Sequence, residues 1–113
     1  MAEIMYREAL NNALFEEMRR DATVFTFGVG IAERGGSYKV TEGLLEEFGS
    51  DRVMDTPIAE ASITGCGIGA ALTGMRPVVE ILFVDFTTLV MEQLVNQAAK
   101  YEFMSGGQGT VPM

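Results

Sequence analysis

The amino-acid sequence predicts an α/β fold in which a parallel β-sheet is flanked by helices, because segments of helical and strand character alternate along it. In residues 4–20 and again in residues 86–103, apolar residues recur at three- and four-residue spacing, which places them on one face of a helix. Residues 77–83 are β-branched and nearly all apolar, as expected of a central strand that is covered on both faces. Glycine-containing loops separate these segments, so each is expected to form its own element.

The first half of the chain is expected to alternate between helix and strand. Gly28 stops the first strand, and the glycines that follow it indicate a loop. Thr41 offers a hydroxyl that can cap the next helix, and Gly49 can adopt the positive φ that the end of this helix requires. The expected elements are a helix over residues 4–20, a strand over 24–27, a short helix containing Leu44, Leu45 and Phe48, and a minimal strand over 52–54.

The second half is expected to begin with a turn and to continue the alternation. The helix after the turn is rich in small residues and contains three glycines, and Gly74 ends it. The last residues are β-prone and lack a polar tail, so we expect them to be the start of a truncated strand. The expected elements are a turn over residues 55–57, helices over 58–72 and 86–103, the central strand over 77–83, and an incomplete strand over 110–113.

Length and composition restrict the class of protein. A chain of 113 residues folds around a single core, so a second complete domain is excluded. The content of 48% apolar and 21% charged residues is that of a globular protein, and Glu80 and Asp85 interrupt the most apolar stretch, so no membrane span is expected. A net charge of −8 repels polyanions and argues against binding to nucleic acid or to an anionic membrane surface.

The chain contains few types of side chain that can form disulfides, bind metals or transfer protons. A single cysteine, Cys66, excludes an internal disulfide framework. Without histidine the usual zinc ligand sets cannot form, so any metal would need oxygen ligands, and no metal site is expected in this chain. The N-terminal residues show no basic region followed by an apolar core, so we expect a cytoplasmic protein. Histidine is the commonest general base, and its absence makes the carboxylates the main candidates for proton transfer.

The small-residue helix carries two features that bear on function. Residues 65–70 contain G-x-G-x-x-A, a near match to the dinucleotide-binding fingerprint, but residues 57–64 do not form the buried strand that must precede it. The favoured interpretation is that the small residues between 65 and 74 let another helix approach closely. Glu60 lies near the first turn, where the helix dipole stabilises a negative charge. Because the positions after it are small or apolar, Glu60 is expected to be buried.

These residues resemble a known family. Asp55 to Glu60, followed by Gly65 to Gly69, is similar to the pyrimidine-domain signature of thiamine diphosphate enzymes, in which a glutamate precedes a glycine series. More closely, essentially all 113 residues resemble the N-terminal part of the beta subunit of 2-oxo acid dehydrogenases of the pyruvate, branched-chain and acetoin types. Several separated motifs in the same order carry this resemblance, namely residues 6–10, 35–44, 74–80 and 104–107.

The resemblance implies a thiamine diphosphate site. Glu60 matches the catalytic carboxyl group that hydrogen-bonds the pyrimidine ring nitrogen and so helps the cofactor's own 4′-amino group to act as a base. Phe86 matches the aromatic residue that stacks on the aminopyrimidine, and Ile58 would lie along the pocket wall. From the residues alone, two plainer interpretations stay open: Glu60 as a helix-start acid, and Phe86 as an ordinary core aromatic.

The resemblance also implies what other chains supply. No Gly-Asp-Gly segment followed by an Asn-containing loop is present, so an alpha-type partner subunit would hold Mg²⁺ and the diphosphate. Further expected partners are a second copy that docks on the Gly-rich helix and the lipoyl acyltransferase of a multienzyme complex. Residues 1–113 would be the N-terminal part of a truncated pyrimidine-binding domain, with the family's catalytic histidine and C-terminal domain lying beyond them.

The leading hypothesis is therefore a fragment of the beta subunit of a thiamine-dependent 2-oxo acid or acetoin dehydrogenase. One departure concerns the acidic residue that many members of that family carry directly after the glycine that ends the first strand, because Val29 follows Gly28 here. Two alternatives stay open. The chain could be the pyrimidine domain of another transketolase-like enzyme, or a non-catalytic α/β interaction domain that uses the glycine-rich helix as a docking surface.

Overall fold

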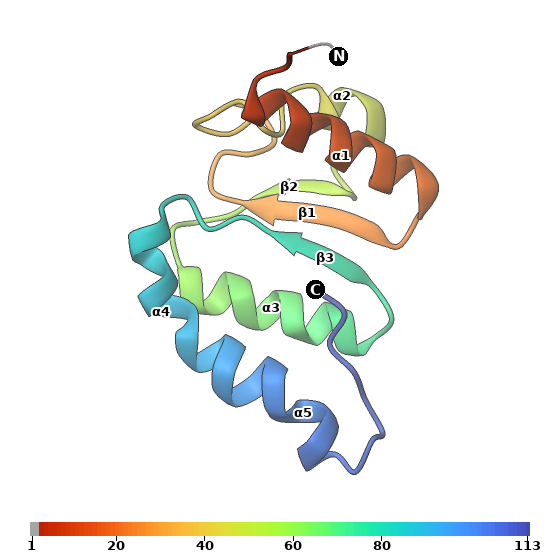
Figure 1. The fold of residues 1–113 in the computed structure, drawn as a ribbon, viewed down its shortest axis with the longest axis vertical. Coiled ribbons are helices and arrows are strands. Elements are labelled where there is room, and N and C mark those ends of the chain that lie inside the picture. The colour runs from red at the N-terminus through yellow and green to blue at the C-terminus, as the bar shows by residue number, and fades with distance from the viewer. Residues whose placement is uncertain (1–2) are drawn as a thin grey trace.

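The computed structural model describes residues 3–113, and within them the chain forms a three-stranded parallel sheet in the order β2-β1-β3 (Figure 1). The strands are β1 (Val24–Gly28), β2 (Val53–Asp55) and β3 (Arg76–Val79). The helices are α1 (Tyr6–Arg20), α2 (Leu44–Phe48), α3 (Glu60–Leu72), the 3₁₀ turn η1 (Val84–Phe86), α4 (Thr87–Met91), the π-helical segment η2 (Glu92–Ala98) and α5 (Ala99–Met104). The predicted α/β class with a parallel sheet flanked by helices is confirmed.

Two helical layers cover the two faces of the sheet. Figure 1 shows α1 and α2 on one side, and α3 with the α4–α5 run on the other. Side chains of a strand alternate between faces, and β1 follows this rule. Val24 packs with Met18 and Leu44 under α1 and α2, whereas Phe25 and Phe27 pack toward α3. All five residues of β1 are buried, because both faces of this strand are covered.

The central strand is β1, so the prediction that residues 77–83 form the central strand is wrong. β1 pairs with β2 through Thr26 and Val53, and with β3 through Val24 and Arg76. The last ladder bond of β3 is donated by the Glu80 N–H to the Phe27 carbonyl, at 3.1 Å. Beyond it β1 has ended, so residues 81–83 have no strand to pair with and leave the sheet.

Two other local predictions are wrong. The Thr41 hydroxyl does not cap α2 but donates to the Ile31 carbonyl at 2.7 Å, because α2 begins three residues later, at Leu44, and its N-cap residue is Gly43. Residues 110–113 form no strand, since Pro112 lacks an N–H and the Met113 N–H is used locally, on the Val111 carbonyl at 3.1 Å.

The predicted helix ends are confirmed. Gly49 ends α2 with φ +77°, and Gly74 follows α3 with φ +96°, values that favour glycine. The predicted helix over 58–72 begins two residues later, at Glu60. The predicted helix over 86–103 is present as α4, η2 and α5, with a wider π turn in its middle. None of the helices within residues 3–113 is long and apolar enough to cross a membrane.

Candidate functional site

The carboxyl ends of the three parallel strands described within residues 3–113 meet at one edge of the sheet. In open α/β sheets, ligands bind outside the carboxyl ends of the strands. Ile58 and Glu60 follow the end of β2, and Phe86 follows the end of β3. The three predicted site residues therefore lie on the two segments that leave this edge.

Glu60 is the first residue of α3 and is half-buried, so its expected burial is only partly met. Its backbone carbonyl accepts a hydrogen bond from the Thr64 hydroxyl at 2.9 Å. Among residues 3–113, no hydrogen bond or ion pair engages the Glu60 carboxylate. The carboxylate therefore sits at the positive end of a 13-residue helix with its oxygens free to bind a ligand.

Ile58 and Phe86 are placed differently. Ile58 lies in the extended turn before α3 and exposes 77% of its surface. Phe86 is half-buried and ends the η1 turn, where α4 begins. The structure thus places an exposed apolar side chain and an aromatic ring on the segments that leave the same edge as Glu60.

Two aromatic residues that the sequence did not single out join Phe86. The Phe83 ring lies 5.5 Å from the Phe86 ring with an interplanar angle of 80°, and the Tyr38 ring lies 6.4 Å from the Phe83 ring at 86°. Both contacts are edge-to-face, the arrangement that the charge distribution of aromatic rings favours. Tyr38 lies on the loop after β1, so the aromatic row joins that loop to the segment after β3.

Glu80, directly after β3, is a third residue that sequence reasoning did not propose for the site. One of its carboxylate oxygens, Oε2, is buried and has no hydrogen-bond partner within residues 3–113, and the Thr56 hydroxyl is in the same state. Burial raises the pKa of the Glu80 carboxyl. A signal was present in the sequence, since Glu80 interrupts the apolar run of residues 77–83.

Gly28 lets Glu80 approach β1. A Cβ atom built on Gly28 would lie 2.9 Å from the Cβ of Glu80, closer than real Cβ atoms come. The next residue, Val29, packs against the apolar cluster of Phe25, Phe27 and Ile63. Position 29, which carries an acid in many members of the resembled family, is therefore part of an apolar contact in this chain.

One glycine of α3, Gly67, is required for close packing inside the chain. A Cβ on Gly67 would lie 2.6 Å from Cγ2 of Val79, and one on Gly65 would lie 3.5 Å from Oε1 of Gln93. Gly67 therefore admits strand β3, whereas the η2 segment lies beside Gly65 at an ordinary van der Waals distance that a Cβ would also allow. The prediction that the small residues admit another helix is thus met only in part, because the residue that needs to be glycine faces a strand. Residues 65–70 lie inside α3 and not at a strand-to-helix turn, which argues against the dinucleotide fingerprint.

An apolar groove of about 410 Å³ runs beside α3. Cys66 is exposed on the face of α3 that borders it. Ile58, Glu60 and Phe86 are not among its lining residues, but Pro57 and Ala59, on either side of Ile58, are. It is lined by Phe25, Phe27, Met54, Thr56, Pro57, Ala59, Ser62, Ile63, Cys66 and Ala70.

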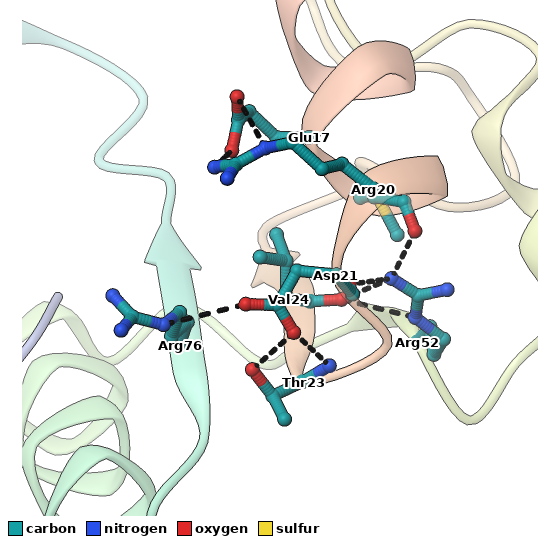
Figure 2. A network of polar contacts seen from close by, with 8 residues as sticks. Glu17, Arg20, Asp21, Thr23, Val24, Arg52 and Arg76 are labelled. Atoms are coloured by element: carbon teal, nitrogen blue, oxygen red, sulfur yellow. Dashed lines mark hydrogen bonds and ion pairs between the residues drawn. The ribbon is translucent and has the colours of Figure 1, made fainter.

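A polar network occupies the opposite, amino end of the sheet (Figure 2). The Asp21 carboxylate accepts hydrogen bonds from the Thr23 hydroxyl at 2.6 Å and the Thr23 N–H at 2.8 Å, and it pairs with Arg76 at 3.4 Å. The Thr23 hydroxyl and N–H, and to a lesser degree Arg76, hold the pKa of Asp21 below its usual value. The Arg52 guanidinium donates to the backbone carbonyls of Met18, Asp21 and Val24 at 2.6–3.0 Å.

No group of three or more Cys, Asp or Glu side chains within residues 3–113 is arranged to hold a metal ion. A parallel sheet whose carboxyl edge carries unpartnered carboxylates is typical of an α/β domain that binds its ligand at that edge. Comparison with known families identifies the particular domain. Residues 2–113 match the model of the transketolase pyrimidine binding domain, and the chain belongs to that family.

Individual relatives are 45–50% identical to this chain over the residues that match. The chain is 50% identical over 113 residues to the pyruvate dehydrogenase E1 component subunit beta of Rhizobium meliloti (strain 1021), covering 100% of this chain and 25% of the relative. It is 50% identical over 98% of its length to the mitochondrial subunit beta-1 of the same component from Oryza sativa subsp. japonica, and covers 30% of that protein. It is 45% identical over its whole length to the 2-oxoisovalerate dehydrogenase subunit beta of Bacillus subtilis (strain 168), of which it covers 35%.

Proposed function

We propose that the chain is part of the beta subunit of a thiamine diphosphate-dependent 2-oxo acid dehydrogenase, in which Glu60 is the acid that contacts the cofactor's aminopyrimidine. The observation that carries the proposal is the half-buried Glu60 carboxylate, which starts α3 at the carboxyl edge of the sheet and has no partner within residues 3–113. Identities of 45–50% to beta subunits of pyruvate and 2-oxoisovalerate dehydrogenases support the same assignment. The chain spans 25–35% of the length of these relatives.

The residues at the carboxyl edge fit a planar ring with a hydrogen-bonding nitrogen. Glu60 offers a carboxyl group, Phe86 offers an aromatic ring, and Ile58 offers an exposed apolar side chain. Stacking and a charge-assisted hydrogen bond are the two contacts by which proteins hold such rings. The site residues Ile58, Glu60 and Phe86 are therefore proposed as the pyrimidine contacts of this chain.

Glu60 is the residue of this site that is proposed to take part in the reaction. Thiamine diphosphate, when bound, supplies the stabilised carbanion needed for decarboxylation of a 2-oxo acid. The Glu60 carboxyl group would form a hydrogen bond to the ring nitrogen, and its position at the start of α3 would keep that group at the carboxyl edge. Phe86 and Ile58 orient the ring and keep water from one side of it. A positioned acid of this kind contributes about 10²–10⁴-fold to a rate.

The proposed partners follow from the same assignment. An alpha-type subunit is proposed to hold Mg²⁺ and the diphosphate, and a lipoyl acyltransferase to take up the product; the relatives' names, which describe beta subunits of larger components, support an assembly of several chains. A second copy is proposed to dock on the exposed face of α3. There Cys66 is exposed, and a Cβ on Gly69 would meet no atom within 4 Å.

The domain assignment and the location are part of this proposal. Residues 1–113 are proposed as the N-terminal part of a pyrimidine-binding domain, which the match over residues 2–113 supports. A cytoplasmic location stays a proposal, since the relatives include bacterial proteins and a protein named as mitochondrial. Another transketolase-like enzyme remains the second candidate, because the matching family model is named for transketolase.

The test is Glu60→Gln in the complete beta subunit, assembled with its alpha-type partner. Gln keeps the size of Glu but cannot hold the acidic proton, so decarboxylation of pyruvate and of 2-oxoisovalerate should fall at least about 100-fold with the complex intact. Glu46→Gln, at an exposed position of α2, is the matched control and should leave the rate unchanged. A Glu60→Gln enzyme that keeps more than about a tenth of the wild-type rate would reduce Glu60 to a helix-start acid.

A further inference from the structure

Tyr38 and Phe83 form an aromatic row with Phe86 at the carboxyl edge, and the proposed function gives these two residues no role. Phe83 exposes 43% of its surface and Tyr38 exposes 58%, which is unusual for large aromatic side chains that serve only a core. Each ring nevertheless meets the next one edge-to-face, at 6.4 Å and 5.5 Å. The row ends at Phe86, the ring proposed to stack on the aminopyrimidine.

We propose that Phe83 is a positioning residue that holds the Phe86 ring in its stacking orientation, and that Tyr38 supports Phe83 from the loop after β1. This inference rests on the proposed function, because it needs Phe86 to contact the cofactor. It adds a role for two residues that do not themselves touch the cofactor. It also joins the loop of residues 29–43 to the pyrimidine site.

Hydrogen bonds fix the backbone around Phe86, but they leave the Phe86 ring free to rotate about its side-chain torsions. The Phe86 N–H donates to the Phe83 carbonyl at 3.0 Å, and the Thr87 hydroxyl donates to the Val84 carbonyl at 2.6 Å, so the η1 turn is well tied. The second side-chain torsion of phenylalanine is broad, and a half-buried ring is not locked by its neighbours on all sides. The perpendicular Phe83 ring supplies the missing contact.

Tyr38 can serve as a support because its loop is anchored. The Gly36 N–H donates to the Gly30 carbonyl at 3.1 Å, and the Thr41 hydroxyl donates to the Ile31 carbonyl at 2.7 Å. Lys39, beside Tyr38, has φ +62°, a conformation that side-chain-bearing residues adopt rarely and that the loop hydrogen bonds maintain. A fixed loop therefore presents Tyr38 to Phe83.

The experiment measures the affinity of thiamine diphosphate, in the presence of Mg²⁺, by calorimetry on the complete beta subunit assembled with its alpha-type partner. Phe83→Leu keeps an apolar side chain but loses the edge-to-face contact, so Kd should rise about two- to tenfold, the range of one aromatic pair. Phe83→Tyr keeps the ring and should restore the wild-type Kd. Tyr38→Leu should raise Kd less than Phe83→Leu does. Phe103→Leu, at a ring that is 91% exposed, is the matched control and should leave Kd unchanged.

A double-mutant cycle separates positioning from a general structural role. In a Phe86→Ala background, Phe83→Leu should change Kd no further, because the ring that it positions is gone. An additional loss of affinity in that background, or a Phe83→Leu protein with wild-type Kd, would overturn the proposal. Thermal midpoints distinguish its failure from that of the proposed function. If Phe86→Ala lowers the midpoint but leaves Kd unchanged, Phe86 is a core aromatic, and its stacking role falls together with the positioning role of Phe83, while the proposed function is still tested separately by Glu60→Gln. Raised Kd in Phe86→Ala with normal Kd in Phe83→Leu removes only the positioning role.

Discussion

The two ends of the parallel sheet differ in how their polar groups are satisfied. At the amino end, Asp21 and Arg52 each bind several partners, and the network ties α1 to the starts of β1 and β3. At the carboxyl end, Glu60 has no carboxylate partner and Glu80 has a buried oxygen without one, among the residues that the structure describes. A satisfied network stabilises a fold, whereas unpartnered groups at a strand end are what a binding site leaves for its ligand.

Arg52→Ala has the largest expected effect and should be confined to stability. Its guanidinium donates to three backbone carbonyls and lies 5.0 Å from the centroid of the Phe48 ring, so its loss leaves these groups without a partner. We expect the free energy of unfolding to fall by roughly 2–3 kcal/mol, measured by urea denaturation. Arg7→Ala, at an exposed position of α1, should change it by less than about 0.5 kcal/mol. Weakened cofactor binding in a folded Arg52→Ala protein would contradict the assignment of stability to the amino end of the sheet and of ligand binding to the carboxyl end.

The next largest effect on stability is expected at Gly67 of α3. Gly69, in the same helix, provides the comparison. Gly67→Ala places a Cβ 2.6 Å from Val79, so the α3–β3 contact must open, at a cost of about 1–3 kcal/mol. Gly69→Ala meets no atom within 4 Å and gains helix propensity, so it should be neutral or stabilising by up to about 1 kcal/mol.

Thermal or urea unfolding of both variants is the measurement. If Gly69 also faces a second copy, Gly69→Ala should lower self-association, measured by light scattering, while the fold stays intact. Equal stabilities of the two variants would show that α3 and β3 do not approach as closely as the structure has them.

The smallest effect is on the pH dependence, which should have opposite signs at the two ends. The raised pKa of Glu80 means that the folded state holds its proton to higher pH than the unfolded state, so this group costs stability as pH rises above about 4.5. Glu80→Gln should therefore be more stable than the wild type at neutral pH, with the difference shrinking as pH falls through the raised folded-state pKa toward about 4.5.

Asp21 is the counterpart at the amino end. Its lowered pKa contributes stability above the usual value of 3.8, and this contribution is lost as pH falls through the folded-state pKa. Asp21→Asn should be less stable than the wild type at neutral pH, and the two should converge in acid. The measurement is the urea-unfolding midpoint of the wild type, Glu80→Gln and Asp21→Asn from neutral to acidic pH. If the stability difference between Glu80→Gln and the wild type grows as pH falls, the sign of the Glu80 prediction is wrong.

Local chemistry made much of the fold predictable. Helical spacing located α1, and glycines marked the ends of α2 and α3, because a positive φ is a property of the single residue. The order of strands was not predictable, since the apolar run of residues 77–83 outlasts its neighbour β1 and only the pairing shows where the sheet ends. Thr41 likewise fits a cap by residue type, but its hydroxyl is used by Ile31, ten residues away.

The residues of the candidate site likewise differ in whether they could be predicted from the sequence. Glu60 could be proposed as a site residue from the sequence because its signature is local, a glutamate just before a glycine series. Tyr38 and Phe83 could not be found, because they are distant in sequence and meet only when the loop after β1 folds toward the end of β3. Glu80 gave a signal as a charge in an apolar run, but its orphaned oxygen depends on Gly28, on another strand.

The most direct test of the central claim, that the carboxyl edge binds the cofactor, is hydrogen–deuterium exchange on the complete beta subunit with its alpha-type partner, with and without thiamine diphosphate and Mg²⁺. The account predicts that the cofactor slows exchange in peptides covering residues 56–63 and 83–90, which contain Ile58, Glu60 and Phe86. Peptides covering residues 18–24 at the amino end should be unaffected. Slowed exchange at residues 18–24 without any change at residues 56–63 and 83–90 would contradict the account.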